Sequence, residues 1–226
     1  EEEKQYFVID FDSTFTQVEA LDILGEISLS NHPEKNARLQ KIKDITDLGM
    51  AGEMSLRESL IARIQLLNGN KAHLPELISR LSKLVSKSIE RNSVFFNEHP
   101  ENTFIISNGF KEFIVPVVTK FGIKADHVFA NDMVFDEDGN IIDLNRNNVL
   151  SINGGKVKQI EALKLKGQIN MIGDGYTDYE VRQAGMANNF YAYTENVERE
   201  PVKKHADHIA PSFDEILYHK KMRWPN

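Results

Sequence analysis

Short apolar runs recur along the chain at wide intervals, and the strong ones are bounded by Gly, Asn or Asp. Four strong runs and two weaker ones cover residues 6–9, 102–109, 127–132, 169–175, 190–194 and 205–210. Runs of this length with such boundaries are typical of buried β-strands. Between them, residues 111–122 and 154–167 carry apolar residues at helical spacing. Strands that alternate with helices predict parallel β-α-β units in a Rossmann-like α/β core.

Residues 17–98 break this alternation, because they contain several helical patterns and no convincing strand. We therefore expect an all-helical insert after the first strand. The chain would then consist of an α/β catalytic core, residues 1–16 and 90–226, and a helical cap, residues 17–89, that determines substrate specificity. Residues 131–143 are expected to form a hairpin around an Asp-Gly turn.

Composition excludes several classes of function. The chain has 226 residues, of which 41% are apolar and 27% charged, as in an ordinary globular protein. Its net charge of −7 argues against a nucleic acid or an anionic membrane as a main partner. No apolar run approaches the roughly 18–20 residues of a membrane span. The absence of cysteine excludes thiolate chemistry, and together with an acidic start, unlike that of a signal peptide, it predicts a cytoplasmic location.

Polar residues follow three of the strong apolar runs. In a parallel sheet, ligands gather outside the carboxyl ends of the strands. The residues at these ends are Asp10 and Asp12, then Ser107-Asn108-Gly109, then Asp174 and Asp178. Four carboxylates at one edge of a sheet repel each other, so we expect a cation among them. Oxygen ligands without His or Cys favour Mg²⁺ over zinc.

Two candidate anion sites balance these carboxylates. Lys156 follows two glycines at an expected helix start, where a basic residue gains nothing from the helix dipole, so we expect it to reach an anion. Ser107 and the backbone N–H groups after it form a second anion site. Each feature alone is more often a turn, a cap or a solvated charge. Their ordered occurrence on three strand ends favours a site for phosphoryl transfer, in which an aspartate beside the metal can be the nucleophile.

Four segments carry a resemblance to a known family. DFDST (10–14), SNG (107–109), GGK (154–156) and GDGYTD (173–178) resemble, in order, the four motifs of the haloacid dehalogenase superfamily of phosphatases. The Ser-Thr pair after the second aspartate and the helical insert look like its phosphoserine phosphatase branch. The similarity runs from Phe7 to about Tyr218. It implies a Rossmann-like parallel-sheet core with a helical cap, and Mg²⁺-dependent hydrolysis of a phosphate monoester.

The resemblance also implies catalytic roles for the aspartates. Asp10 would attack phosphorus and carry the phosphoryl group, while Asp12 would protonate the leaving alcohol and then activate water. Mg²⁺ would be held by Asp10, the backbone carbonyl of Asp12 and Asp174, with Asp178 supporting the site. Because Asp12 is two residues after Asp10, both would face one way in an extended strand, so the following loop must aim them differently.

The same resemblance places three groups around the phosphate. Ser107 and Lys156 would hold phosphoryl oxygens, with Lys156 also steadying the nucleophile, and Thr177 matches a polar position near the phosphate. The phosphoserine branch usually has Ser-Gly-Gly at the second motif, whereas this chain has Asn108 before Gly109. Asn tolerates a left-handed backbone, but we expect its side chain to intrude where backbone amides meet the substrate.

Substrate choice is expected to come from the cap. Phosphoserine carries an ammonium and a carboxylate besides its phosphate, so a dry pocket needs an anion and a cation, ideally Arg, to bind it. Glu19 matches the family's glutamate near the amino group, Arg63 its carboxylate-binding arginine and Met50 a pocket methionine. Arg57 lies nearby but falls on a position that is not the family's arginine.

These observations predict a phosphatase that converts O-phospho-L-serine to L-serine and phosphate. The implied pathway is L-serine biosynthesis, the partner is a small phosphate ester, and the chain is expected to be a monomer or homodimer. Two alternatives stay open at this point. One is a phosphatase or phosphotransferase for another small phosphate ester, and the other is a non-catalytic phosphoamino-acid binding or regulatory domain.

Overall fold

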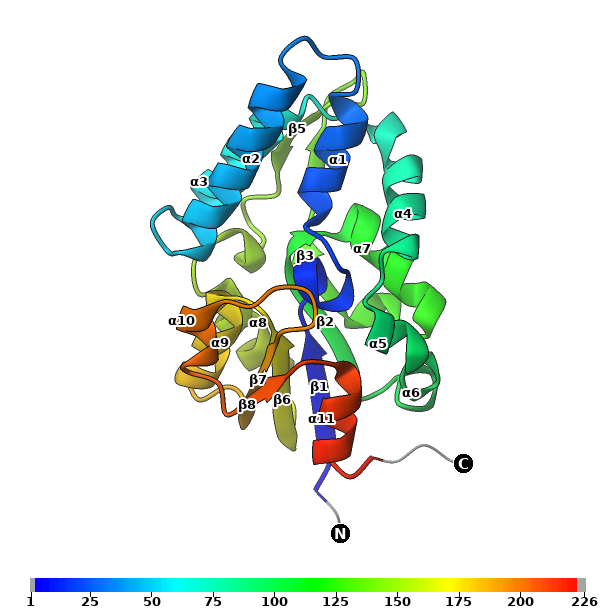
Figure 1. Cartoon of the computed structure of the whole chain (residues 1–226), viewed down its shortest axis with the longest axis vertical. Coiled ribbons are helices and arrows are strands. Elements are labelled where there is room, and N and C mark those ends of the chain that lie inside the picture. The colour runs from blue at the N-terminus through cyan, green and yellow to red at the C-terminus, as the bar shows by residue number, and fades with distance from the viewer. Residues whose placement is uncertain (1–2, 223–226) are drawn as a thin grey trace.

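A six-stranded parallel sheet forms the centre of the molecule in the computed structural model, which describes residues 3–222. The strand order is β3-β2-β1-β6-β7-β8 (Figure 1). In chain order the strands are β1 (Gln5–Ile9), β2 (Thr103–Phe110), β3 (Val128–Asn131), β6 (Gln168–Gly173), β7 (Asn189–Tyr193) and β8 (His208–Ala210). All six apolar runs therefore contain strands, and the predicted α/β core is confirmed.

Strand β1 is buried on both faces at the middle of the sheet. It pairs in parallel with β2 on one side and with β6 on the other. Phe7 and Ile9 belong to one apolar cluster, whereas Tyr6 and Val8 belong to the cluster on the opposite face. This alternation follows from the two-residue period of a strand, and burial on both faces explains why the run is continuously apolar.

Helices cover both faces of the sheet. Residues of α8 (Gly155–Leu163), α9 (Tyr176–Gln183) and α10 (Glu200–Lys203) pack into the cluster that contains Val8. The other face is covered by α5 (Lys87–Arg91), α6 (Ser93–Glu98), α7 (Lys111–Val118) and α11 (Phe213–His219). Pro116 lies inside α7, neither at its start nor at its end.

The remaining helices of the insert form a bundle at one end of the molecule (Figure 1). They are α1 (Ala20–Ser28), α2 (Lys35–Met50), α3 (Leu56–Leu67) and α4 (Leu74–Lys83). Two short connections lie side by side between bundle and core, because Gln17 N donates to Leu84 O at 2.7 Å and Ser86 N donates to Phe15 O at 2.8 Å. The insert is thus a cap on two adjacent linkers. No helix within residues 3–222 has both the length and the apolar character needed to cross a membrane.

The structure contains the expected hairpin and attaches it to the cap. Strands β4 (Met133–Phe135) and β5 (Ile141–Leu144) pair antiparallel around a turn in which Gly139 has a φ of 84°, a value that favours glycine. Ile141 N donates to Gly69 O at 2.9 Å, and Lys71 N donates to Gly139 O at 2.8 Å. The hairpin follows β3 in the chain but extends to the far end of α3.

We expect Ile9→Ala to destabilise the protein strongly. Ile9 is fully buried in β1, so its loss leaves a cavity at the centre of the sheet and should lower the free energy of unfolding by about 2–5 kcal/mol. The measurement is chemical denaturation followed by circular dichroism. Ile142→Ala is the matched control, because Ile142 is 53% exposed and its loss should change stability by less than about 0.5 kcal/mol. Equal effects of the two changes would contradict the central position of β1.

Candidate active site

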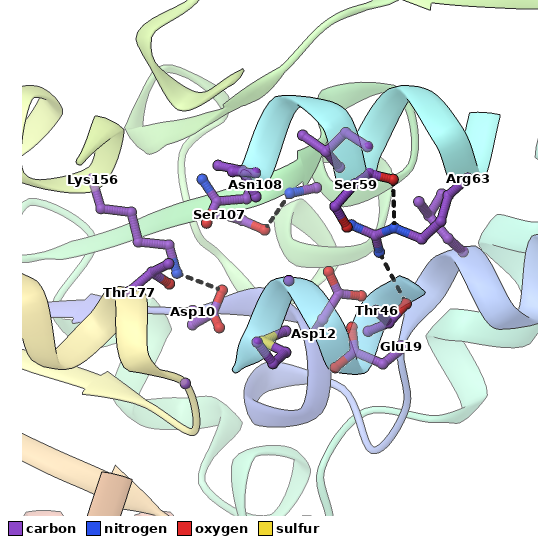
Figure 2. A pocket seen from close by; sticks show the side chains of 17 residues that line it. Asp10, Asp12, Glu19, Thr46, Ser59, Arg63, Ser107, Asn108, Lys156 and Thr177 are labelled. Carbon is purple, nitrogen blue, oxygen red and sulfur yellow. Dashed lines mark hydrogen bonds and ion pairs between the residues drawn. The ribbon is translucent and has the colours of Figure 1, made fainter. Parts of the chain in front are cut away.

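The expected site residues meet at the carboxyl edge of the sheet, beneath the cap. This is the point where the strand order reverses between β1 and β6, which is where open α/β sheets bind ligands. One pocket is lined by ten of the twelve predicted site residues (Figure 2): Asp10, Asp12, Glu19, Met50, Arg63, Ser107, Asn108, Gly109, Lys156 and Thr177. The other two, Asp174 and Asp178, are buried beside Asp10.

A tight loop, residues 11–15, aims the first two aspartates in different directions. Ser13 adopts a left-handed conformation in this loop, with a φ of 57°. Asp10 Oδ1 lies 3.2 Å from Nζ of Lys156, whereas Asp12 Oδ1 accepts a hydrogen bond of 2.7 Å from the first backbone N–H of α1. The two carboxylates are therefore held separately, one by the core and one by the cap.

Lys156 is the central cation of the core side. Its Nζ lies 3.2 Å from Asp10 Oδ1 and 2.7 Å from Asp178 Oδ1, and the residue is only 3% exposed. Burial by itself lowers the pKa of Lys156, but the charges of Asp10 and Asp178 outweigh burial and raise the pKa overall. Gly155 lets the start of α8 pack closely against the backbone of Val149, because a Cβ on Gly155 would lie 2.0 Å from Val149 O. Lys156 therefore stays protonated beside the nucleophile candidate.

Three buried carboxylates form a group that fits a divalent cation. One oxygen from each of Asp10, Asp174 and Asp178 lies within 4.8 Å of the other two. Burial, with the charge of Asp10 adding to it, raises the pKa of Asp174 to about 7 and that of Asp178 well above its ordinary value. Thr14 Oγ1 donates to Asp174 Oδ1 at 3.1 Å and so orients that carboxylate. A hard cation would relieve the repulsion within this all-oxygen group.

Arg199 is a site residue that the sequence analysis missed. Its Nε donates to Asp174 Oδ2 at 3.2 Å, from the segment between β7 and α10. In the sequence, Arg199 stands among other charged residues, between Glu198 and Glu200, and no motif distinguishes it. Only the fold brings this segment back to the end of β6.

The phosphate-side residues lie at the end of β2. Ser107 is buried, and its Oγ accepts a hydrogen bond of 2.9 Å from Gly109 N. Asn108 lines the pocket, but its Nδ2 donates to Leu150 O at 3.0 Å. The side-chain amide is therefore bonded to the core through Nδ2, and its intrusion on the substrate stays a prediction. Asn131 Nδ2 donates to the same Leu150 oxygen at 3.0 Å and fixes the arrangement further.

Opposite charges lie on the cap side of the pocket. Glu19 Oε1 accepts a hydrogen bond of 2.9 Å from Ser13 Oγ. Arg63 donates from Nε to Ser59 O at 3.2 Å and from Nη1 to Thr46 Oγ1 at 3.3 Å (Figure 2). Burial, aided by the charge of Asp12, raises the pKa of Glu19 to about 8, and burial lowers the pKa of Arg63. No ion pair joins Glu19 to Arg63 within the described residues. Each group is thus available to a ligand, and with a pKa of about 8 Glu19 is largely protonated near neutral pH until a cation binds beside it.

We expect Glu19→Gln to flatten the pH dependence of stability in the protein without added metal or phosphate. A carboxyl group whose pKa rises on folding, here from 4.5 to about 8, is protonated more readily in the folded state, so stability falls as the pH rises through this window. The Tm of Glu19→Gln should therefore decline less across it than the Tm of the unchanged protein. Glu137→Gln, in an exposed turn, is the control. Parallel curves for Glu19→Gln and the unchanged protein would argue against a buried, destabilised Glu19.

The chain is similar to known proteins in fold and in sequence. No family model matches the chain. A phosphoserine phosphohydrolase-like protein from Francisella tularensis subsp. tularensis SCHU S4 has a similar structure, with a TM-score of 0.85 and 30% identity, and the match covers 96% of this chain and 99% of that one. A phospho-aspartyl intermediate analogue of phosphoserine phosphatase, at 20% identity and a TM-score of 0.75, shows the same fold.

Two curated relatives have similar sequences over most of their length. The chloroplastic phosphoserine phosphatase of Arabidopsis thaliana is 29% identical over 212 residues, which cover 92% of this chain and 69% of that protein. The phosphoserine phosphatase of Homo sapiens is 29% identical over 211 residues, which cover 92% of this chain and 89% of that protein. With the four motifs assembled at one edge of the sheet, this chain belongs to the phosphoserine phosphatase-like branch of the haloacid dehalogenase superfamily of phosphatases.

Proposed function

We propose that the chain hydrolyses O-phospho-L-serine to L-serine and phosphate, through a phosphoryl group carried on Asp10. The observation that supports this substrate is the pair of opposite charges, Glu19 and Arg63, in the pocket that also holds Asp10 and Lys156. Relatives named phosphoserine phosphatase are similar over most of the chain. In a cytoplasmic protein this reaction would be a step of L-serine biosynthesis, and a monomer or homodimer stays our prediction for the assembly.

The core residues are suited to the transfer itself. Mg²⁺ held by Asp10, Asp174 and Asp178 and by the backbone carbonyl of Asp12 would offset the negative charge of the phosphate and the nucleophile. Lys156 keeps its proton and lies 3.2 Å from Asp10, so it can orient that carboxylate and bind a phosphoryl oxygen.

The phosphate-binding groups complete the core side of the proposal. Ser107 and the backbone N–H groups after it lie at the end of β2, where they can donate hydrogen bonds to the remaining phosphoryl oxygens. Thr177 lines the same pocket near the start of α9. The phosphoryl group would then pass from the serine oxygen to Asp10 while its other oxygens stay bound to fixed donors.

Asp12 is suited to proton transfer at the leaving oxygen. Burial, with the nearby charges of Asp10 and Asp174 adding to it, raises the pKa of Asp12 to about 7. A carboxyl group with this pKa can hold a proton near neutral pH and donate it to the departing alkoxide. The resulting carboxylate can then accept a proton from the water that cleaves the phosphoryl-Asp10 bond.

The cap residues are suited to the amino-acid part of the substrate. Glu19 presents a carboxyl group to the substrate ammonium, and Arg63, held through Nε and Nη1, has a further NH₂ group for the carboxylate. Met50 and several leucines of the cap line the same space and would exclude water from these charges. A phosphoserine phosphatase with bound substrate shares this fold, with a TM-score of 0.77 at 20% identity.

Arg63→Ala tests the substrate. We expect the KM for phosphoserine to rise about tenfold or more, because a charge-assisted contact to its carboxylate is lost, while the KM for p-nitrophenyl phosphate should change less than about twofold. Arg80→Ala is the matched control, since Arg80 lies on the cap and pairs only with Glu26 and Glu76. The assay includes phosphoethanolamine, with and without Mg²⁺. Equal turnover of phosphoethanolamine and phosphoserine, or an equal effect of Arg63→Ala on both test esters, would favour another phosphate ester as substrate.

Asp10→Asn tests the nucleophile. The amide is nearly isosteric but cannot attack phosphorus, so we expect turnover of every phosphate ester to fall by about 10³-fold or more. The circular dichroism spectrum should stay unchanged. Asp138→Asn, in the exposed turn of the hairpin, should keep full activity. Substantial turnover by Asp10→Asn would rule out an aspartyl-phosphate at this position.

A further inference from the structure

The first turn of α3 is bonded directly to the core. Arg57 Nη2 donates to Arg146 O at 2.7 Å and to Ser151 Oγ at 2.8 Å. Next to it, Leu56 N donates to Asn153 Oδ1 at 2.9 Å. We call these three hydrogen bonds the α3 contact. They join the cap to residues 146–153 of the core, on the side of the pocket opposite the two linkers.

Residues 146–153 are in turn fastened to the phosphate side of the site. Leu150 O accepts hydrogen bonds from Asn108 Nδ2 and Asn131 Nδ2, each at 3.0 Å. Ser151 Oγ, the acceptor for Arg57, donates to Asn148 O at 2.7 Å. Residues 146–153 therefore contact the cap through Ser151 Oγ, and they contact the Ser107-Asn108-Gly109 strand end through Leu150 O. The segment also leads directly into Lys156.

Helix α3 lines the cap side of the pocket. It carries Arg63 on the cap side, and Leu56, Ser59 and Leu60 line the same pocket. Its first turn is bonded to the core, so the α3 contact bears on where Arg63 lies relative to Asp10. A change at the α3 contact would therefore alter substrate binding without touching the substrate.

The site is closed in this arrangement. Asp10 is 7% exposed, Lys156 is 3% exposed and Arg63 is 8% exposed, so movement of the cap away from the core would widen the path of a phosphate ester to these groups. The adjacent linkers at residues 15–17 and 84–86 can act as the hinge. A rotation of the cap about these linkers, with the hairpin bonded to the far end of α3 moving along, would break the α3 contact on opening and form it again on closing.

The chemistry of Arg57 is suited to a contact that forms and breaks. Its acceptors are a backbone carbonyl and a hydroxyl, and none of the ion pairs among residues 3–222 includes Arg57. Its Nε is buried without a hydrogen-bond partner. Breaking a buried ion pair is costly because it leaves a buried charge without its partner. Separation of Arg57 from its acceptors leaves no carboxylate in that state. Water can replace each neutral acceptor when the cap opens.

We propose that Arg57 is a positioning residue that holds the cap closed over the bound phosphate ester. It does not contact the substrate. It acts through α3 on Arg63 and through residues 146–153 on Asn108 and Lys156. This role rests on the phosphatase fold and not on phosphoserine as the substrate.

The kinetic test compares Arg57→Ala, Arg57→Lys and Arg80→Ala on p-nitrophenyl phosphate and on phosphoserine, with Mg²⁺ present. For Arg57→Ala we expect KM to rise about tenfold, which corresponds to the loss of one hydrogen bond from a charged donor. We expect kcat to change less than about twofold, because saturating substrate still drives closure of the cap. Arg57→Lys should recover most of the loss, and Arg80→Ala should behave as the unchanged protein. An Arg57→Ala variant with an unchanged KM would overturn the proposal.

A double-mutant cycle tests the partner of Arg57. Ser151→Ala should raise KM on its own but have little further effect when combined with Arg57→Ala, because the bond is already lost. Fully additive effects would show that Arg57 acts elsewhere. If phosphoserine is not the substrate, its turnover fails in the unchanged protein too, while the p-nitrophenyl phosphate series still decides the role of Arg57.

Hydrogen exchange separates a closing contact from a general structural role. In Arg57→Ala, amides of residues 55–60 and 146–153 should exchange faster, while those of β1 and β6 should not change. Inorganic phosphate with Mg²⁺ should slow exchange in these two segments in the unchanged protein and less so in Arg57→Ala. Faster exchange throughout the sheet, with a lowered Tm, would overturn the proposal, because Arg57 would then stabilise the whole fold.

Discussion

The repulsion among three buried carboxylates is the constraint on which the rest of this structure depends. Asp10, Asp174 and Asp178 lie within reach of one cation, and among residues 3–222 only Lys156 and Arg199 form ion pairs with them. Three carboxylates against two cations leave a net negative charge in a buried place, so the group is stable only with a further cation or with a bound proton. The elevated pKa values of Asp174 and Asp178 express the same imbalance. A phosphate ester can approach these carboxylates only when their charge is offset.

The order of the strands in the sheet brings these carboxylates together. Because β1 lies between β2 and β6, the ends of three strands that are far apart in the sequence meet around one point. The insertion after β1 then places the cap directly behind the loop that carries Asp10 and Asp12. The hydrogen bond from the first N–H of α1 to Asp12 makes the candidate general acid part of the junction between core and cap. Closure of the cap and placement of the acid are thereby linked.

The proposed recognition of the substrate and the proposed closure of the cap involve different arginines of the same helix. Arg63 lies in the pocket with its guanidinium held by Ser59 and Thr46, whereas Arg57, six residues earlier, turns to the core. One helix can therefore bind the substrate through Arg63 and contact, through Arg57, the segment 146–153 that is bonded to Asn108. The hairpin of β4 and β5 supports the opposite end of α3. The cap is attached to the core at its linkers and at both ends of this helix.

The strands and the helical insert were predictable from local features of the chain, as were the polar residues at the strand ends, whereas Glu19, Met50, Arg63 and Thr177 were proposed only through the family resemblance. The two-residue and helical periods of apolar residues, and the order of the motifs at the strand ends, do not depend on distant contacts. Three other features did depend on distant contacts: the orientation of Asn108, the role of Arg199 and the docking of the hairpin on the cap. Each needs a hydrogen bond between residues far apart in the chain, at separations of 42, 25 and 72 positions respectively. The sequence by itself therefore determined which side chains meet at the edge of the sheet. Only the tertiary structure decided which of them are bonded to the protein and which face the ligand, since buried polar groups take their partners from whatever the fold brings near.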